Sequence, residues 1–148
     1  RPLIDPLEIA RQIDCPLSVV LRRIAPMPEG PGPECGLVLS DSSGTVTFRR
    51  MIEGFPIPRY GAGCPLWPLY QSLTQPHQPI RTEVRQAGYD GKDFTAFAVS
   101  ESRLAPSFGG PRVFEATMLI LPSRLFGVVN DDNRLPIGAS CRICPRED

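Results

Sequence analysis

The stretch Val113-Phe-Glu-Ala-Thr-Met-Leu-Ile-Leu121 decides the fold of this chain. It is almost wholly apolar, and Pro122 follows it at once. A short apolar run that ends in a turn signal is typical of a strand buried on both faces. We therefore expect this strand near the centre of a sheet, with the other elements arranged around it.

Two predicted strand pairs precede the central strand. Residues 36–40 form an apolar strand and residues 45–49 a β-branched strand, and the turn Asp41-Ser-Ser-Gly44 joins them into a hairpin. Residues 80–86 and 93–100 have the composition of a second hairpin. The sequence therefore predicts four to six strands, most of them antiparallel.

Helices are expected on either side of the first hairpin. Residues 1–29 are expected to be helical, because Asp5 is a suitable N-cap and Pro6 suits the first helical position. Apolar residues then recur at helical spacing. After the first hairpin, Pro65 is expected to begin a third helix that reaches Leu73.

These elements predict one domain over residues 1–148, of the α/β (α+β) class. It comprises N-terminal helices at 1–29, a sheet core with an inserted helix at 35–129, and an irregular, cysteine-bearing tail at 136–148. A mostly antiparallel sheet flanked by helices is the arrangement of GAF-like and PAS-like sensor domains. We take that arrangement as the expected architecture.

Composition excludes several classes of function. The chain has 16 basic and 16 acidic residues, and this zero balance argues against binding of a phosphate backbone by this segment. No run of about 18 apolar residues is present, so no membrane span is expected. Five cysteines fit a disulfide framework poorly and indicate a reducing, cytoplasmic setting.

Three cysteines are the main candidates for chemistry. Cys141 and Cys144 have the Cys-x-x-Cys spacing that lets two thiolates bind one ion from a tight loop. Cys64 follows Gly61-Ala-Gly63 and is expected near the start of the third helix, where unpaired amides favour a thiolate. Together they predict a metal site that joins the end of the chain to its middle.

Other interpretations of the cysteines stay open at this point. The bound metal is an iron–sulfur cluster or a zinc ion; alternatively, the thiols are buried apolar groups and a free pair in the tail. A thioredoxin-like role is disfavoured, because Cys141 follows a Pro-Ile-Gly turn rather than a strand-to-helix junction. A zinc-stabilised dimerisation module without a small ligand is the main alternative function.

No constellation of catalytic residues is found. The chain lacks Gly-x-Ser-x-Gly, a zinc-binding pair of histidines and a phosphate-binding glycine loop, so we expect it not to be an enzyme. Arg59 lies in an irregular segment with other arginines nearby, where a guanidinium is suited to a ligand phosphate or carboxylate.

Several motifs resemble those of bacterial short-chain fatty acyl-CoA regulators. The resemblance covers roughly residues 35–148, and its specific motifs are confined to 41–73 and 136–146. The residues that carry it are Gly54-Phe-Pro56, Pro58-Arg-Tyr-Gly-Ala-Gly-Cys-Pro-Leu-Trp67, and the ending Pro136-Ile-Gly138 with Cys141-Arg-x-Cys144. Members usually join an amino-terminal Xre-type helix-turn-helix to a carboxy-terminal sensor domain.

The resemblance implies a function that the composition does not. It implies a GAF-like domain that binds a short-chain acyl-CoA, and a 4Fe–4S cluster for which Cys64, Cys141 and Cys144 match three of the ligands. The resemblance marks no residue that contacts coenzyme A, and we name Arg59 as the candidate contact from its own setting. It also implies that the chain is part of a longer, homo-oligomeric regulator of fatty acid or propionate-type metabolism. That regulator would contact DNA only through its helix-turn-helix.

Overall fold

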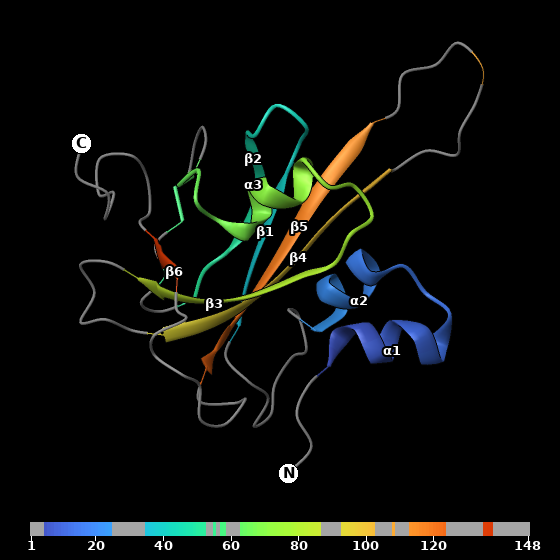
Figure 1. Cartoon of the computed structure of the whole chain (residues 1–148), viewed down its shortest axis with the longest axis horizontal. Coiled ribbons are helices and arrows are strands. Elements are labelled where there is room, and N and C mark those ends of the chain that lie inside the picture. Colours follow the sequence, from blue (N-terminus) through green and yellow to red (C-terminus); the bar gives the residue numbers. More distant parts are fainter. Residues whose placement is uncertain are drawn as a thin grey trace.

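The computed structural model describes residues 5–24, 35–52, 55, 57–58, 63–86, 93–102, 108, 113–123 and 135–137. Within these residues, six strands form one sheet (Figure 1). The strands are β1 (Gly36–Ser40), β2 (Val46–Arg50), β3 (Ile80–Gln86), β4 (Asp93–Ser102), β5 (Phe114–Pro122) and β6 (Leu135–Ile137). The helices are α1 (Pro6–Ile13), α2 (Leu17–Ile24) and α3 (Pro68–Leu73).

The sheet has the strand order β2-β1-β5-β4-β3-β6. Every neighbouring pair is antiparallel except β3 and β6, which run parallel. The apolar stretch at residues 113–121 forms nearly all of β5, which lies between β1 and β4, as predicted for a central strand. The expected class, α+β with a mostly antiparallel sheet, is confirmed, while the likeness to GAF-like and PAS-like domains stays a prediction.

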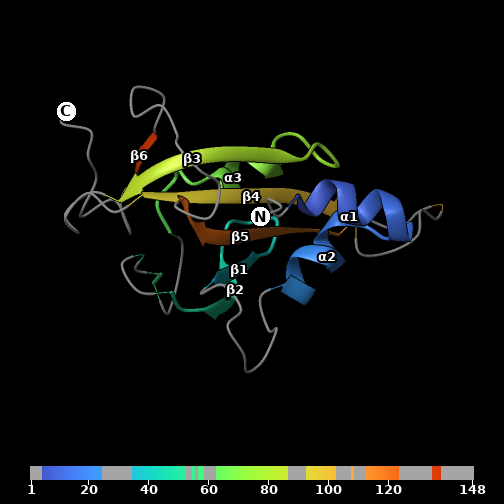
Figure 2. The same ribbon diagram turned by 90° about the horizontal axis from the view of Figure 1, so that it is seen from below.

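Side chains alternate along the central strands and divide the core into two clusters. Ala96, Ala98, Met118 and Ile120 point to one face and pack in a cluster with Trp67 and Leu69. Phe97, Val99, Leu119 and Leu121 point to the other face and pack with α1 and α2. The sheet is therefore covered by α3 on one face and by the α1–α2 hairpin on the other (Figure 2).

The N-terminal helices form as the sequence predicts. Asp5 caps α1, because its Oδ1 accepts the amide hydrogens of Leu7 at 3.1 Å and Glu8 at 3.3 Å. Pro6 occupies the first turn, where its lack of an amide hydrogen costs nothing. No helix in the described part of the chain is long and apolar enough to cross a membrane.

The tail differs from the prediction at its start. Residues 136–148 were expected to be irregular, yet Leu135–Ile137 forms β6 against Val84–Gln86 of β3. The strand was not predicted because it contains Pro136, and proline usually interrupts strands. At the edge of a sheet it is tolerated, since its missing amide hydrogen deprives no further strand of a partner.

Candidate functional site

Cys64 lies in the cluster that α3 covers. Its side chain is fully buried, in the same apolar cluster as Phe55 and Trp67. Its carbonyl oxygen accepts the amide hydrogen of Trp67 at 3.0 Å, which closes a tight turn over Pro65 and Leu66. The thiol is thus shielded from water by the surrounding side chains.

The predicted start of the third helix was wrong by three residues. The helix begins at Pro68, whereas Pro65 belongs to the turn that follows Cys64. Both prolines suit the first helical position, and the sequence alone does not distinguish them. Cys64 therefore lies four residues before α3, so the helix terminus expected beside the thiol is not there.

Gly63 is required by the ring of Trp67. A Cβ atom added at Gly63 would lie 2.1 Å from Cζ3 and 2.4 Å from Cη2 of the indole. Because Trp67 is fully buried, its ring has no room to move aside. The glycine before the cysteine is thus explained by packing.

Tyr70 joins this turn to the β1–β2 hairpin. Its hydroxyl accepts the amide hydrogen of Gly63 at 2.7 Å and donates to the carbonyl oxygen of Gly44 at 2.9 Å. The ring also stacks on Trp67, with the ring centroids 6.1 Å apart. Burial is the main cause that raises the pKa of Tyr70, and nearby Cys64 adds to the effect.

The turn that Tyr70 reaches is held by Asp41. Its Oδ1 accepts the hydroxyl of Ser43 at 2.6 Å and the amide hydrogens of Ser43 and Thr45 at 2.9 and 3.1 Å. The hydrogen bond from the Ser43 side chain is the largest cause of the lowered pKa of Asp41. Gly44 completes the turn at a φ of 92°, which glycine adopts without strain.

The strand β6 places the start of the cysteine-bearing tail at the edge of the sheet, beside β3. It pairs with β3 from Val84 onward, and Val84 belongs to the same apolar cluster as Cys64. Cys141 is four residues beyond Ile137, the end of β6, so the Cα atoms of these two residues are at most about 14 Å apart. Cys141, Cys144 and Arg59 lie outside the described residues, which by themselves contain no group of three metal-ligating side chains.

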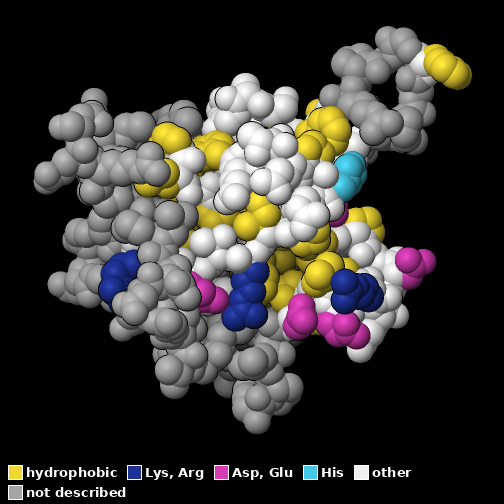
Figure 3. Space-filling model, viewed as in Figure 1, with side chains coloured by type: hydrophobic (Ala, Val, Ile, Leu, Met, Phe, Trp, Pro, Cys, Tyr) yellow, Lys and Arg dark blue, Asp and Glu magenta, His cyan; other side chains and the backbone are white. Residues whose placement is uncertain are grey.

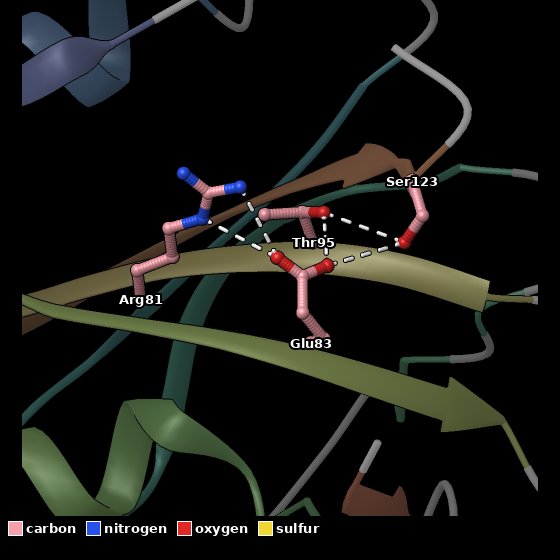
Figure 4. Close-up of polar contacts among 4 residues, drawn as sticks. All are labelled: Arg81, Glu83, Thr95 and Ser123. Carbon is pink, nitrogen blue, oxygen red and sulfur yellow. Dashed lines mark hydrogen bonds and ion pairs between the residues drawn. The ribbon is translucent and has the colours of Figure 1, made fainter. Parts of the chain in front are cut away.

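A second group of polar side chains lies on the opposite face, across β3, β4 and the end of β5 (Figure 4). Glu83 is at its centre: its Oε2 accepts the hydroxyl of Thr95 at 2.6 Å and that of Ser123 at 3.4 Å. Its Oε1 accepts from Nε of Arg81 at 3.3 Å. Thr95 is fully buried, so the carboxylate is held on a rigid support.

This group of polar side chains was not predicted from the sequence. Its only signal was the alternation of Arg81, Glu83 and Arg85 along β3, which places all three on one face of the strand. That alternation resembles an ordinary solvent-exposed edge, because the partners on β4 and β5 are not near in sequence.

The comparisons with known proteins agree on one family. Residues 34–148 match the family model described as "Short-chain fatty acyl coenzyme A regulator, C-terminal". The chain is 30% identical over 123 residues to the HTH-type transcriptional regulator PrpR of Mycobacterium tuberculosis, covering 74% of this chain and 24% of that relative. It is 29% identical over 118 residues to a propionyl-CoA carboxylase regulator of Cereibacter sphaeroides, covering 73% and 24%.

A solved structure supports the fold. It is titled "Mycobacterium tuberculosis transcriptional regulator", and it matches with a TM-score of 0.76 at 24% identity over 97% of this chain and 46% of that one. At this identity the match shows the fold alone. The chain spans about a quarter of the length of the curated relatives that it matches.

Proposed function

Because this chain belongs to the family of short-chain fatty acyl coenzyme A regulator C-terminal domains, we propose that it is the ligand-sensing part of a bacterial transcriptional regulator. Its ligand is a short-chain acyl-CoA. The observation that carries the proposal is the family match, which includes the whole sheet and the Cys64 turn. One relative is named an HTH-type transcriptional regulator and another a propionyl-CoA carboxylase regulator, which supports a role in fatty acid or propionate-type metabolism.

The proposed mechanism is a shift between two conformations. A ligand shifts such an equilibrium only by its difference in affinity for the two states. The acyl-CoA would bind one state of this domain, and a helix-turn-helix elsewhere in the regulator would report that state to DNA. We place the regulator in the cytoplasm as a homo-oligomer, in which the state of one copy is coupled to that of the next.

Arg59 is the proposed contact for the phosphates of coenzyme A. Its neighbourhood supports this role, because Nη1 of Arg49 on β2 donates to the carbonyl oxygen of Ile57 at 2.8 Å. That hydrogen bond fixes the backbone two residues before Arg59. A guanidinium presents a planar fork of donors that matches the oxygens of a phosphate.

We further propose that Cys64, Cys141 and Cys144 hold a 4Fe–4S cluster, with zinc as the alternative. The buried, apolar setting of Cys64 supports a soft thiolate site, and the pairing of β6 with β3 supports the approach of the tail cysteines. Such a cluster, when bound, supplies a response to oxidants. The surrounding apolar side chains would limit access of solvent to it.

The acyl-CoA proposal predicts a rise in melting temperature with ligand. At 100 times the dissociation constant, a ligand of the native state adds about 2.7 kcal/mol to the free energy of unfolding. Differential scanning fluorimetry with acetyl-, propionyl- and butyryl-CoA at millimolar concentration measures the shift. The absence of any shift with all three would refute the proposal.

The cysteine proposal is tested separately by metal content. Anaerobic purification followed by iron, sulfide and zinc analysis should give about four irons per chain for a 4Fe–4S cluster. Cys64→Ala, Cys141→Ala and Cys144→Ala should each lower the iron content, and Cys15→Ala, at a half-buried cysteine near α1, should not. One zinc per chain without iron would favour the zinc-stabilised dimerisation module. If the purified chain contains neither iron nor zinc, both the cluster and the zinc site are excluded.

A further inference from the structure

A polar cavity of about 260 Å³ lies between α2 and the adjoining ends of β4 and β5. The side chains that matter for its chemistry come from the helix and from both strands: Ser18, Val19, Arg22, Glu101 and Glu115. A second cavity under the α1–α2 hairpin, of about 220 Å³, differs in having mostly apolar walls. Figure 3 shows acidic and basic side chains together over the hairpin, so the charge of the polar cavity depends on the few residues that line it.

The lining of the polar cavity carries a net negative charge. Glu101 and Glu115 are register partners on β4 and β5, which places their Cβ atoms about 5 Å apart on one face of the sheet. The helix supplies one cation, Arg22, whose Nη1 lies 3.6 Å from Oε1 of Glu115. Two carboxylates against one guanidinium leave one negative charge without compensation.

Glu101 is the carboxylate that lacks a cation. Its Oε1 accepts the hydroxyl hydrogen of Ser18, a neutral donor, and no basic side chain of the described residues pairs with it. Arg22 is already engaged, because its Nε donates to the carbonyl oxygen of Ser18 at 3.4 Å and its Nη1 pairs with Glu115. The cavity therefore presents a carboxylate that can accept hydrogen bonds from a further cation.

A buried hydroxyl beside the carboxylates also lacks a partner. Thr117 follows Glu115 by two residues on β5, so both side chains project from the face that α2 covers. Thr117 is fully buried, and its Oγ1 makes no hydrogen bond in the part of the chain that the structure describes. A buried polar atom without a partner is rare in native proteins and indicates a bound water or ion. This hydroxyl adds an acceptor on the side of the sheet where the cavity lies.

The lining favours an organic cation over a metal ion. Ca²⁺ takes about six to eight oxygen ligands, whereas the described residues contain no group of three metal-ligating side chains. At about 30 Å³ for each water of the liquid, the cavity has room for roughly eight non-hydrogen atoms, far more than one ion needs. Ammonium and guanidinium groups are donors without acceptors and so match carboxylates, which are acceptors only.

We propose that this cavity binds a small organic cation, with its ammonium or guanidinium group between Glu101 and Glu115 and its alkyl chain along Val19. The size fits the side chain of a lysine or an arginine. Two sources supply this chemistry, a free alkylamine or alkylguanidine and a basic side chain of another protein. The site does not depend on the acyl-CoA proposed above as the ligand of this domain.

Titration with simple cations gives the first test. We expect n-butylammonium and n-butylguanidinium to shift the amide resonances of α2 and of the adjoining ends of β4 and β5 in NMR spectra, with dissociation constants of about 1–10 mM, as is usual for so few atoms. The neutral 1-butanol and the anionic butyrate should bind at least about tenfold more weakly, because neither donates a charge-assisted hydrogen bond. The same affinity for all of these probes, or no binding of either cation well above this range, would overturn the proposal.

Two further probes identify the source and check the class of ligand. N-acetyl-lysine methylamide carries the same ammonium group on a peptide backbone. If it binds as well as n-butylammonium, the cavity can accept a side chain of another protein; if only n-butylammonium binds, the ligand is a free amine. Binding of calcium chloride at the carboxylates, without binding of either organic cation, would replace the proposal with a metal site.

Matched variants give the second test, with effects of opposite sign. Glu101→Gln keeps an acceptor for Ser18 but removes the negative charge, and should weaken n-butylammonium binding at least about tenfold. Its control is Glu8→Gln on the exposed side of α1, which should leave binding unchanged. Arg22→Gln removes the competing cation and should strengthen binding about threefold, whereas Arg23→Gln, its exposed neighbour outside the cavity, should not.

The opposite signs distinguish a binding site from a structural role. If these carboxylates only support the docking of α2, their substitution changes the urea midpoint and leaves the affinity for n-butylammonium as it was. If both test variants bind like their controls, the cation binds elsewhere and the cavity is not its site. None of these results bears on the proposed function, which acyl-CoA titration tests by itself.

Discussion

Tyr70 has more contacts than its place on a short helix suggests, because one hydroxyl connects the Cys64 turn to the β1–β2 hairpin. Tyr70→Phe keeps the ring stacked on Trp67 and removes only these two hydrogen bonds. We expect a loss of about 1–3 kcal/mol in the free energy of unfolding, since two backbone groups lose a part-buried partner. Urea denaturation measures it; a change below about 0.5 kcal/mol would show that water replaces the hydroxyl.

The raised pKa of Tyr70 also predicts a pH dependence. Above about pH 10 the unfolded chain loses this proton while the folded chain keeps it, so stability falls as the pH rises through the folded pKa. The contribution is fully present below pH 10. Tyr70→Phe should make the alkaline loss of stability shallower, which urea denaturation between pH 8 and 11 would reveal; identical slopes in both proteins would contradict it.

Gly63 gives a prediction about packing. Gly63→Ala forces a methyl group into the Trp67 ring and should destabilise the fold by about 1–3 kcal/mol, as overpacking does. The double variant with Trp67→Leu makes room for the methyl group. It should therefore be more stable than the sum of the two single variants by urea denaturation, and simple additivity would argue against the clash.

At the scale of elements, α2 docks on the sheet over two carboxylates. Glu101 and Glu115 are register partners on β4 and β5, an arrangement that is unfavourable for like charges. The helix offsets this repulsion, because the hydroxyl of Ser18 donates to Glu101 and Nη1 of Arg22 lies 3.6 Å from Glu115. The position of α2 along the strands is therefore set by charge as well as by apolar packing.

A double-mutant cycle tests this docking. Ser18→Ala should cost about 1 kcal/mol, because Glu101 loses a part-buried donor next to a like charge. Glu101→Gln in the same background should recover most of that loss, which gives a coupling of about 1 kcal/mol between the two residues. Arg22→Gln is the comparison; its longer ion pair, made by a half-exposed arginine, is expected to contribute less than about 1 kcal/mol.

The strands were more predictable than the ends of elements. The hairpin at Gly36–Arg50 and the strands β3, β4 and β5 were expected within two residues of their observed bounds, because alternation and turn residues are local signals. The start of α3 and the strand β6 were not, since proline is ambiguous at both places. Whether a proline begins a helix or lies in an edge strand is decided by contacts between residues that are far apart in the sequence.

The candidate site shows the same division. Cys64 was recognisable from its motif, but its burial and the role of Tyr70 depend on the meeting of two loops. Arg81 and Phe97 come from different strands and line one cavity with Leu7 and Leu17, which forms only where the α1–α2 hairpin packs on the sheet. Sequence patterns indicate what a residue contributes within its element and say little about what lies across from it.

At the scale of the whole molecule, the two apolar clusters share the central strands and should unfold together. Leu21 of α2 is fully buried on the opposite face of the sheet from Trp67, the single tryptophan. Leu21→Ala should cost about 2–5 kcal/mol. Circular dichroism and tryptophan fluorescence should nevertheless report the same urea midpoint, and a tryptophan transition that stayed at its original midpoint would show that the faces unfold separately.

The strand order has a consequence for how fast this chain reaches its native state. Short loops connect β1 to β2 and β3 to β4, so these hairpins involve little loss of chain entropy. The pairing of β1 with β5 instead brings Gly36 beside Ile120, and closing so long a loop is slow. We expect this step to limit the folding rate: the two hairpins form early, and the pairing of β1 with β5 forms last.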